Sequence, residues 1–353
     1  MDYTKLSNKE LKDECKKQKI KGYSKLKKEE IIKLLEENKE EENLEENLEE
    51  NNKINNQINN EEENKHSYKD NYITLYNNDC LKSLNFIKDK SIQLICIDPP
   101  YNIGKDNWDI IEDYNNFMLN VIKKLELKLK DNGSFFMFHN NMETISELMI
   151  LIKNNTSFKF KQMIVWNKRF EESPKKGYMD GYVVKEDLHN WNKMAEYILF
   201  YTFDNHKKLK QKREELNISQ ITISQEILSK TGGLTGWYSN LETGRNLPTR
   251  ETIKPITKLL GLTYDDIVPK FNNLKTHHSV WNYDMASRNE IHITPKPKDL
   301  LKNIILHTTD ENDLVLDCFA GTGSLGIACK ELKRKCILIE KEKKYVSNII
   351  KNL

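Results

Sequence analysis

The chain has 353 residues, of which 37% are hydrophobic and 31% are charged, and its formal net charge is +2. This length is sufficient for one large domain and one or two small ones. No stretch reaches the roughly 18 uninterrupted apolar residues of a membrane span, and the polar start is unlike a signal peptide. We therefore expect a cytoplasmic protein with no membrane segment, and a net charge this small does not by itself indicate nucleic-acid binding.

The six cysteines form no close Cys-x-x-Cys pair, and most lie in apolar segments. Cysteine in such surroundings packs as a small hydrophobic side chain. We expect neither a metal site nor disulfides.

Residues 1–36 are expected to form a small helical module. Ser7 can cap a first helix that runs to Cys15, Gly22 interrupts the pattern, and residues 28–35 resume it. Through residues 10–12 and 31–35 the segment resembles SAP-type helix-loop-helix modules. If it binds DNA, we expect non-specific phosphate contacts. A capped helical pair with a solvated charged face is the alternative.

Residues 37–66 consist mainly of Glu and Asn. A segment of this composition buries too little apolar surface to offset the cost of ordering, so we expect a disordered linker.

The remainder alternates short apolar strands with helical stretches, which predicts an α/β fold with a mainly parallel sheet. Residues 67–204 and 273–353 share this pattern, and residues 205–272 form a purely helical insert between them. The expected strands cover residues 72–76, 92–97, 134–138, 162–166, 197–201, 314–317 and 336–339.

The tetrapeptide Asp98-Pro99-Pro100-Tyr101 closes the apolar run of residues 91–97, which predicts a buried parallel strand stopped by two prolines. In an open α/β sheet, ligands bind just outside such strand ends. The tetrapeptide places a carboxylate, a rigid backbone and an aromatic ring there. This set suits a flipped nucleobase with an exocyclic amine. The alternative is a strand-ending turn with a solvated acid.

A second motif, Gly321, Gly323 and Gly326 in G-x-G-x-x-G spacing, joins an expected strand to a helix. An NAD fingerprint has the same glycines, with an acid such as Glu340 after the next strand. Asp317 and Phe319 discriminate between the two cofactors. A carboxylate before the turn repels a pyrophosphate, whereas a carboxylate and an aromatic face both suit the cationic sulfonium and amino group of S-adenosylmethionine. We therefore favour the methyl donor over NAD.

Together, the tetrapeptide and the run Phe319-Ala320-Gly321-Thr322-Gly323 resemble the motifs of amino-methyltransferases that modify N6 of adenine or N4 of cytosine in DNA. Because the tetrapeptide comes first, the chain is similar to the permuted β class. The resemblance covers roughly residues 70 to 353 apart from the insert, and it implies a Rossmann-like methyltransferase fold. Further agreement comes from residues 78–81, 165–168, 195–199 and 292–297.

The resemblance also implies roles for individual residues. Asp79 would contact the adenine of the cofactor and Glu340 its ribose, and Lys296 would lie beside the cofactor pocket. The methionine and sugar would be held by Phe319, Gly321 and Gly323, together with the charge of Asp317. The usual motif has Pro and Thr where this chain has Cys318 and Ser324, and both changes are small.

The catalytic motif would be Asp98, Pro99, Pro100 and Tyr101. The carboxylate of Asp98 and the carbonyl of Pro99 can each accept one N–H of the target amine, which favours a pyramidal nitrogen whose lone pair points at the sulfonium methyl. Tyr101 can stack on the base once it has left the duplex. An acid in the first position resembles the adenine-N6 enzymes more than the cytosine-N4 enzymes, which often carry Ser there. We expect His139 on the next strand to be a solvated rim residue.

The helical insert resembles repressor-type helix-turn-helix domains through Ser239-Asn240-x-Glu242-x-Gly244 and the following Pro248. We hypothesise that its third helix enters the major groove. The alternative is a protein-interaction module or scaffold. The candidate DNA-binding residues are Thr235, Trp237, Tyr238, Ser239, Asn240 and Arg245.

The expected function is therefore methyl transfer from S-adenosylmethionine to the N6 of an adenine in double-stranded DNA. The alternatives are cytosine-N4 methylation, RNA or protein-amide methylation, and a catalytically silent DNA-binding regulator. Members of the class are often dimeric, so a homodimer is one expectation. Nothing in the sequence identifies a partner restriction endonuclease.

Overall fold

The computed structural model describes residues 7–18, 20, 23, 26–35, 66–102, 104, 109–168, 170, 194–227, 232–233, 235–274, 278–286 and 295–353. The chain divides into two compact units, Met1–Asn64 and Lys65–Leu353. Except for residue 66, the expected linker 37–66 lies outside the described residues, as do residues 292–294 of the last family segment.

The first unit contains a pair of helices, as expected. Helix α1 (Asn8–Lys17) begins with a capping box, in which the Ser7 and Glu10 side chains each accept a hydrogen bond from the other residue's backbone N–H. A second helix covers residues 28–35. Leu11, Cys15, Ile31 and Leu35 are fully buried between the two helices, so the unit has a small apolar core of its own.

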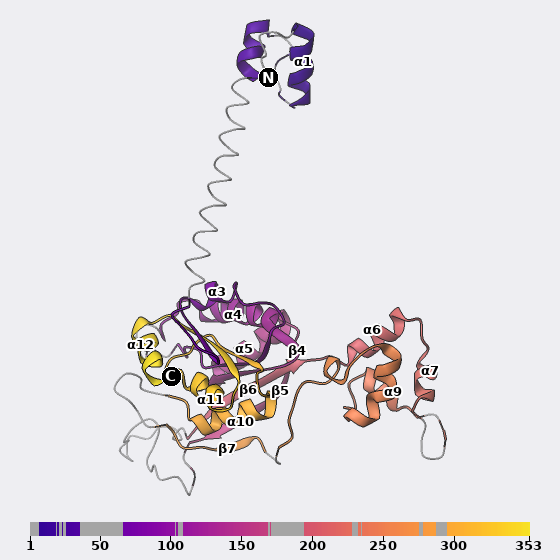
Figure 1. Cartoon of the computed structure of the whole chain (residues 1–353), viewed down its shortest axis with the longest axis vertical. Coiled ribbons are helices and arrows are strands. Elements are labelled where there is room, and N and C mark those ends of the chain that lie inside the picture. Colours follow the sequence, from indigo (N-terminus) through magenta and orange to yellow (C-terminus); the bar gives the residue numbers. More distant parts are fainter. Residues whose placement is uncertain are drawn as a thin grey trace. The chain divides into compact units, whose positions relative to one another are not determined.

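The second unit is built on a sheet (Figure 1). Its described strands follow the order β1-β2-β9-β8-β3-β4-β6-β5-β7. The pairs from β2 through β9, β8 and β3 to β4 are parallel, while β6 runs antiparallel to both β4 and β5. The strands are β1 (Tyr68–Lys69), β2 (Ile73–Asn77), β3 (Ile92–Ile97), β4 (Leu129–His139), β5 (Phe158–Asn167), β6 (Ala195–Phe203), β7 (Val280–Asn282), β8 (Leu314–Asp317) and β9 (Lys335–Glu340).

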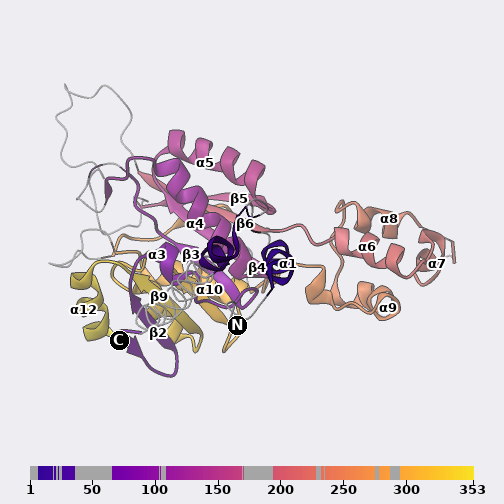
Figure 2. The same cartoon turned by 90° about the horizontal axis from the view of Figure 1, so that it is seen from above.

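Helices cover both faces of this sheet (Figure 2). One face packs against α3 (Cys80–Ser83), α4 (Tyr114–Lys128) and α5 (Met142–Asn155), and the other against α10 (Lys298–Thr308), α11 (Ser324–Glu331) and α12 (Lys343–Asn352). All six residues of β3 are buried, because Ile95 and Ile97 face one apolar cluster and Leu94 and Cys96 the other. This explains why the strand appears in the sequence as an unbroken apolar run. The expected α/β Rossmann-like fold is confirmed.

The parallel register brings four strand ends together at one edge of the sheet. Ile95 pairs with Leu316, Asp317 with Leu338, and Asn77 with Glu340. Parallel strands with matched register end at the same edge, so the residues that follow β2, β3, β8 and β9 are neighbours in space although they are far apart in sequence.

The insert is helical, as expected, and contains α6 (Lys207–Glu215), α7 (Gln220–Gln225), α8 (Trp237–Glu242), α9 (Arg250–Leu260) and the short 3-10 helix η5 (Tyr264–Asp266). It projects to one side of the sheet (Figure 1), and an apolar cluster that includes Leu209, Ile223, Leu241 and Ile256 fills its interior. A helical bundle with its own core can fold as a local unit.

A buried ion pair ties three of these helices together. Glu242 on α8 accepts hydrogen bonds from Arg213 Nε and from Gln220 Nε2, both at 2.6 Å, and the Arg213 and Glu242 side chains are 13% and 4% exposed. Removing the carboxylate would leave the guanidinium without its partner in a poorly solvated place.

We predict that Glu242→Gln lowers the stability of the insert by about 2 kcal/mol. Hydrogen exchange should rise in α6, α7 and α8 and stay unchanged in β3 and β8. Glu251→Gln is the matched control, because Glu251 pairs with Lys254 at a site where both side chains are at least 70% exposed. Equal exchange in both variants would contradict a structural role for the pair.

Candidate active site

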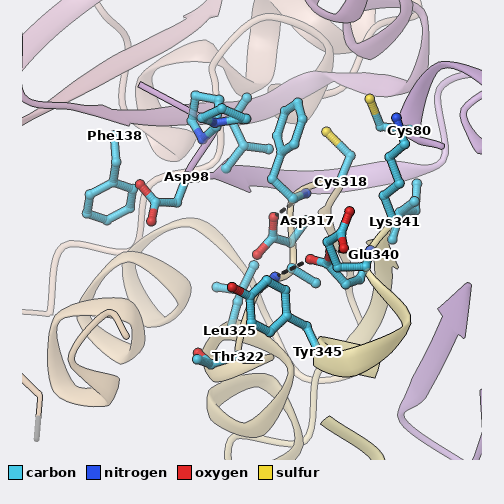
Figure 3. A pocket seen from close by; sticks show the side chains of 18 of the residues that line it. Cys80, Asp98, Phe138, Asp317, Cys318, Thr322, Leu325, Glu340, Lys341 and Tyr345 are labelled. Atoms are coloured by element: carbon cyan, nitrogen blue, oxygen red, sulfur yellow. Dashed lines mark hydrogen bonds between the residues drawn. The ribbon is translucent and has the colours of Figure 1, made fainter. Parts of the chain in front are cut away.

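A cavity of about 530 Å³ lies at the edge where the parallel strands end (Figure 3). It is lined on one side by all four residues of the Asp98-Pro99-Pro100-Tyr101 tetrapeptide and on another by Asp317, Phe319, Gly321 and Glu340. This volume lies within the range of small-molecule and cofactor sites. The two motifs that the sequence separates by more than 200 positions therefore open into one space.

The side chain of Glu340 anchors the backbone of the glycine-rich loop. The backbone N–H of Gly321 donates to Glu340 Oε2 at 2.7 Å, and the backbone N–H of Glu342 donates to Oε1 at 2.8 Å. The carboxyl is 8% exposed, and burial raises its pKa. Glu340 thus shapes the loop and also lines the cavity beside Gly321.

Gly323 and Gly326 shape the loop without facing the cavity. Gly323 has a φ of 74°, and an added Cβ would lie 2.9 Å from Ile349 Cγ2. A Cβ on Gly326 would lie 2.6 Å from Leu338 Cδ1, so a side chain there would have to displace Leu338 where α11 packs against β9. Gly323 is buried, and its expected contact with the cofactor stays a prediction.

Asp317 places a carboxyl group at the base of this loop. Its Oδ1 accepts a hydrogen bond from the backbone N–H of Phe319 at 3.0 Å, and the residue is 6% exposed. Burial, reinforced by the negative charges of Asp98 and Glu340, raises its pKa to about 8. A cationic ligand in the cavity would favour the ionised form, so Asp317 fits the sulfonium and amino group of S-adenosylmethionine.

Asp79 lines the same cavity from the end of β2. It caps α3, with Oδ1 accepting from the backbone N–H of Leu81 at 2.9 Å, and its Oδ2 lies 3.8 Å from Lys341 Nζ. The structure therefore brings together the expected cofactor residues Asp79, Asp317, Phe319, Gly321 and Glu340. Their individual contacts with the cofactor stay predictions.

Both carboxylate oxygens of Asp98 accept hydrogen bonds. Tyr101 Oη donates to Asp98 Oδ1 at 2.6 Å, and Lys296 Nζ donates to Asp98 Oδ2 at 2.5 Å. The Asp98 side chain is 28% exposed and that of Lys296 is 9% exposed. Lys296 lines the cavity, and its direct partner is Asp98, a contact that the sequence did not suggest.

Tyr101 is packed into the wall of the cavity. It is 7% exposed, and its ring centroid lies 4.7 Å from that of His139. Asp109, which sequence reasoning missed, fixes the backbone here, since its Oδ1 accepts from the N–H groups of Tyr101 and Asn102 at 2.7 and 2.9 Å. Stacking of Tyr101 on a base is therefore limited to the part of the ring that faces the cavity.

The expectation that His139 is solvated is wrong. His139 is fully buried, and burial lowers its pKa to about 4, so it is neutral at physiological pH. Its Nδ1 accepts from the backbone N–H of Asn141 at 3.1 Å, which places the proton on Nε2, 3.3 Å from Tyr114 Oη. Tyr114 in turn donates to the Pro100 carbonyl at 2.7 Å. This chain of hydrogen bonds, from Asn141 through His139 and Tyr114, fixes the Pro100 carbonyl and so the tetrapeptide.

A second carboxylate, Glu196, was also missed. It lies on β6, is 4% exposed and lines the cavity. Lys168, at the end of β5, donates a hydrogen bond to its Oε1, and Lys296 Nζ lies 3.6 Å from its Oε2. Both Lys168 and Glu196 stand in segments that agree with the family, but strand patterning alone gave no sign that their charges would meet.

Most of the candidate DNA-binding residues lie on accessible parts of the insert. Ser239 and Arg245 are exposed, while Thr235, Trp237 and Asn240 are half-buried. Tyr238 is 1% exposed and belongs to the core of the insert. The expectation that Tyr238 contacts bases is wrong, because its ring is used for packing α8 against its neighbours.

Two general features of the described part of the chain bear on the kind of site. No group of three or more His, Cys, Asp or Glu side chains is placed to hold a metal ion among the described residues. No helix of that part is long and apolar enough to cross a membrane.

Comparison with known proteins identifies the same family as the sequence motifs. Residues 92–352 match the model of the N6/N4 methyltransferase family, described as DNA methylase. Type II methyltransferase M1.MboII of Moraxella bovis is 27% identical over 77% of this chain and 93% of its own length. DNA adenine methyltransferase YhdJ of Escherichia coli (strain K12) is 27% identical over 79% of this chain and 82% of its own length.

A solved structure supports the fold independently of the sequence. PvuII DNA methyltransferase (cytosine-N4-specific) superposes with a TM-score of 0.55 at 16% identity, covering 81% of this chain and 88% of that one. The family match begins at β3 and includes the tetrapeptide and the glycine-rich loop, in the order typical of the permuted class. The chain belongs to the S-adenosylmethionine-dependent DNA methylases of the β-class N6/N4 amino-methyltransferase family.

Proposed function

We propose that the protein methylates the exocyclic N6 of an adenine that has been flipped out of duplex DNA at a specific sequence. One observation carries the proposal. The acid of the tetrapeptide and the acid of the glycine-rich loop line a single cavity, so a target amine and a sulfonium can occupy it together. S-adenosylmethionine supplies the electrophilic methyl group there.

The residues of the tetrapeptide are suited to an amine of low reactivity. The lone pair of an exocyclic adenine amine is conjugated into the ring, and two hydrogen-bond acceptors on its N–H groups favour a pyramidal nitrogen. Asp98 supplies a carboxylate whose orientation is set by Tyr101. The Pro99 carbonyl is the second acceptor, and among the described residues none donates a hydrogen bond to it.

The surrounding side chains fix these acceptors before the base arrives. Asp109 holds the backbone after Pro100, and Tyr114 holds the Pro100 carbonyl. A site whose dipoles are already oriented needs little reorganisation during the reaction. This supports a catalytic role for the tetrapeptide over a simple strand-ending turn.

Adenine is the favoured base because the first position of the tetrapeptide is an acid. The relative from Escherichia coli is named as an adenine methyltransferase, which agrees with this choice. Cytosine-N4 methylation is the second candidate, since the structural neighbour of that specificity has the same fold. The two bases present the same kind of amine to Asp98 and Pro99, so the fold alone does not separate them.

The direct test is transfer of a radiolabelled methyl group to DNA, RNA and protein in parallel, followed by nucleoside analysis of the labelled DNA. The proposal predicts label in duplex DNA as N6-methyladenine. Label as N4-methylcytosine would support the second candidate, and label in RNA or protein alone would reject both.

Asp98→Ala should reduce methyl transfer to DNA by at least about 100-fold, because the amine loses its charged acceptor. The affinity for S-adenosylmethionine, measured by calorimetry, should change little, since the expected cofactor residues stand at or just after the ends of β2, β8 and β9. Equal loss of transfer and of cofactor binding would defeat the assignment of Asp98 as the amine acceptor.

Asp317 should make cofactor binding depend on pH. Its pKa is about 8 in the free protein, and a bound cation lowers it, so binding releases a proton below about pH 8. Affinity should therefore rise with pH towards about 8, by up to about tenfold per unit. Asp317→Asn should bind more weakly and show a flatter profile, as measured by calorimetry in buffers of different ionisation enthalpy. Identical profiles in the two proteins would show that Asp317 does not face the cation.

The insert is proposed to recognise the DNA sequence through α8, on the strength of its helical arrangement and of the exposed Ser239 and Arg245. Replacing Ser239, Asn240 and Arg245 together with Ala should weaken DNA binding by about tenfold or more and relax site preference. Cofactor affinity should be retained. Lys254→Ala, which removes a charge that is 70% exposed on α9, is the control. Unchanged site preference in the triple variant would favour a protein-interaction role for the insert.

A further inference from the structure

Four charged side chains of alternating sign form a row at the Asp98 end of the cavity, and three of them are buried. They are Lys168, Glu196, Lys296 and Asp98. Lys168 is hydrogen-bonded to Glu196 Oε1, and Lys296 Nζ lies 2.5 Å from Asp98 Oδ2 and 3.6 Å from Glu196 Oε2. The side chains of Lys168, Glu196 and Lys296 are at most 9% exposed.

Lys296 is charged in this setting. Burial alone would lower its pKa, but the carboxylates of Asp98 and Glu196 act in the opposite direction and raise the pKa above its ordinary value. Its ammonium also lies 5.5 Å from the centroid of the Tyr101 ring and 5.2 Å from that of Phe138. Aromatic faces at such distances stabilise a cation.

A fixed ammonium beside Asp98 would oppose the reaction. During transfer the amine lone pair forms the N–C bond and the C–S bonding pair goes to sulfur, so positive charge builds up on the nitrogen. One proton of the resulting ammonium then leaves to Asp98 and from there to water. A cation held against the oxygen that accepts the N–H repels this developing charge.

On the basis of the proposed function, we infer that Lys296 is a positioning residue. Its ammonium changes its carboxylate partner from Asp98 to Glu196 during the catalytic cycle. It holds Asp98 while the site contains no base, and it moves to Glu196 when the target amine enters. Asp98 is thereby kept oriented in the free enzyme and is released as an acceptor only when the amine is present.

The Lys296 ammonium has only a short distance to move between the two carboxylates. Lys296 Nζ already lies within ion-pair distance of Glu196 Oε2, and a lysine ammonium on its flexible stem can shift without moving the backbone. Glu196 contacts Lys168 through its other oxygen, so it can receive Lys296 without releasing its first partner. The Tyr101 and Phe138 rings lie near the ammonium in its starting position.

Glu196→Gln removes the second carboxylate and should leave Lys296 on Asp98. We expect the single-turnover rate of DNA methylation to fall by about 100-fold. The affinities for S-adenosylmethionine and DNA should stay within about threefold of the wild type, because neither is bound through Glu196. Thermal unfolding and cofactor affinity report whether each variant is folded.

The decisive comparison uses double variants. Lys296→Met combined with Glu196→Gln should regain at least about tenfold over Glu196→Gln alone, each at its own optimum pH, because no ammonium then blocks Asp98. Lys168→Met combined with Glu196→Gln also removes one positive charge from the row but leaves Lys296 in place, so its methylation rate should not recover.

Lys296→Arg keeps the positive charge and supplies a second folded variant. The rigid guanidinium fork can bridge both acids, so methyl transfer should slow by about tenfold.

Wild-type rates in Glu196→Gln, or equal rates in the two double variants, would overturn the exchange. A wild-type enzyme that leaves DNA unmethylated in the same assay would instead overturn the proposed function. Methylation by the wild type without rescue in the Lys296 double variant would reject this inference alone.

Discussion

The parallel pairing of β3 with β8 is the constraint on which the site depends. Leu94 pairs with Val315 and Ile95 with Leu316, so both strands end at the same level of the sheet. This register places Asp98 and Asp317 near each other, because Asp98 comes directly after β3 and Asp317 is the last residue of β8. A shift by one residue would exchange the two buried faces of β3, which pack against different helices, and would displace Asp98 from Asp317. The same pairing that buries the core therefore brings the two acids to one cavity.

The cavity brings together several carboxyl groups, whose negative charges must be offset by positive ones. Asp98, Asp317 and Glu340 line one cavity, and the negative charges of Asp98 and Glu340 help to raise the pKa of Asp317. Lys296 offsets the charge at the catalytic end. At the other end the offset is expected from the cationic cofactor, which explains why a carboxyl with so high a pKa is kept in the loop. The two ends of the cavity are thus linked by the effect of the Asp98 charge on the pKa of Asp317.

The sequence was sufficient to predict the sheet, the helical insert and the two motifs, because buried parallel strands leave apolar runs and turns leave glycines and prolines. It could not show that Lys296 contacts Asp98 or that Asp109 holds the tetrapeptide, since these contacts depend on side chains from different elements. It assigned Tyr238 to the DNA surface because motif position does not reveal which side of a short helix faces the core. His139 was misplaced for a similar reason, as a strand end can be buried beneath a neighbouring helix.

In the proposed reaction, one cavity holds the amine and the methyl donor together. A bisubstrate analogue, in which the N6 of adenosine is linked to the position of the transferred methyl group on a cofactor mimic, measures this directly by calorimetry. We predict that it binds more tightly than the cofactor mimic alone, and that Asp98→Ala removes the gain. An affinity equal to that of the cofactor mimic, unchanged in Asp98→Ala, would contradict a shared site.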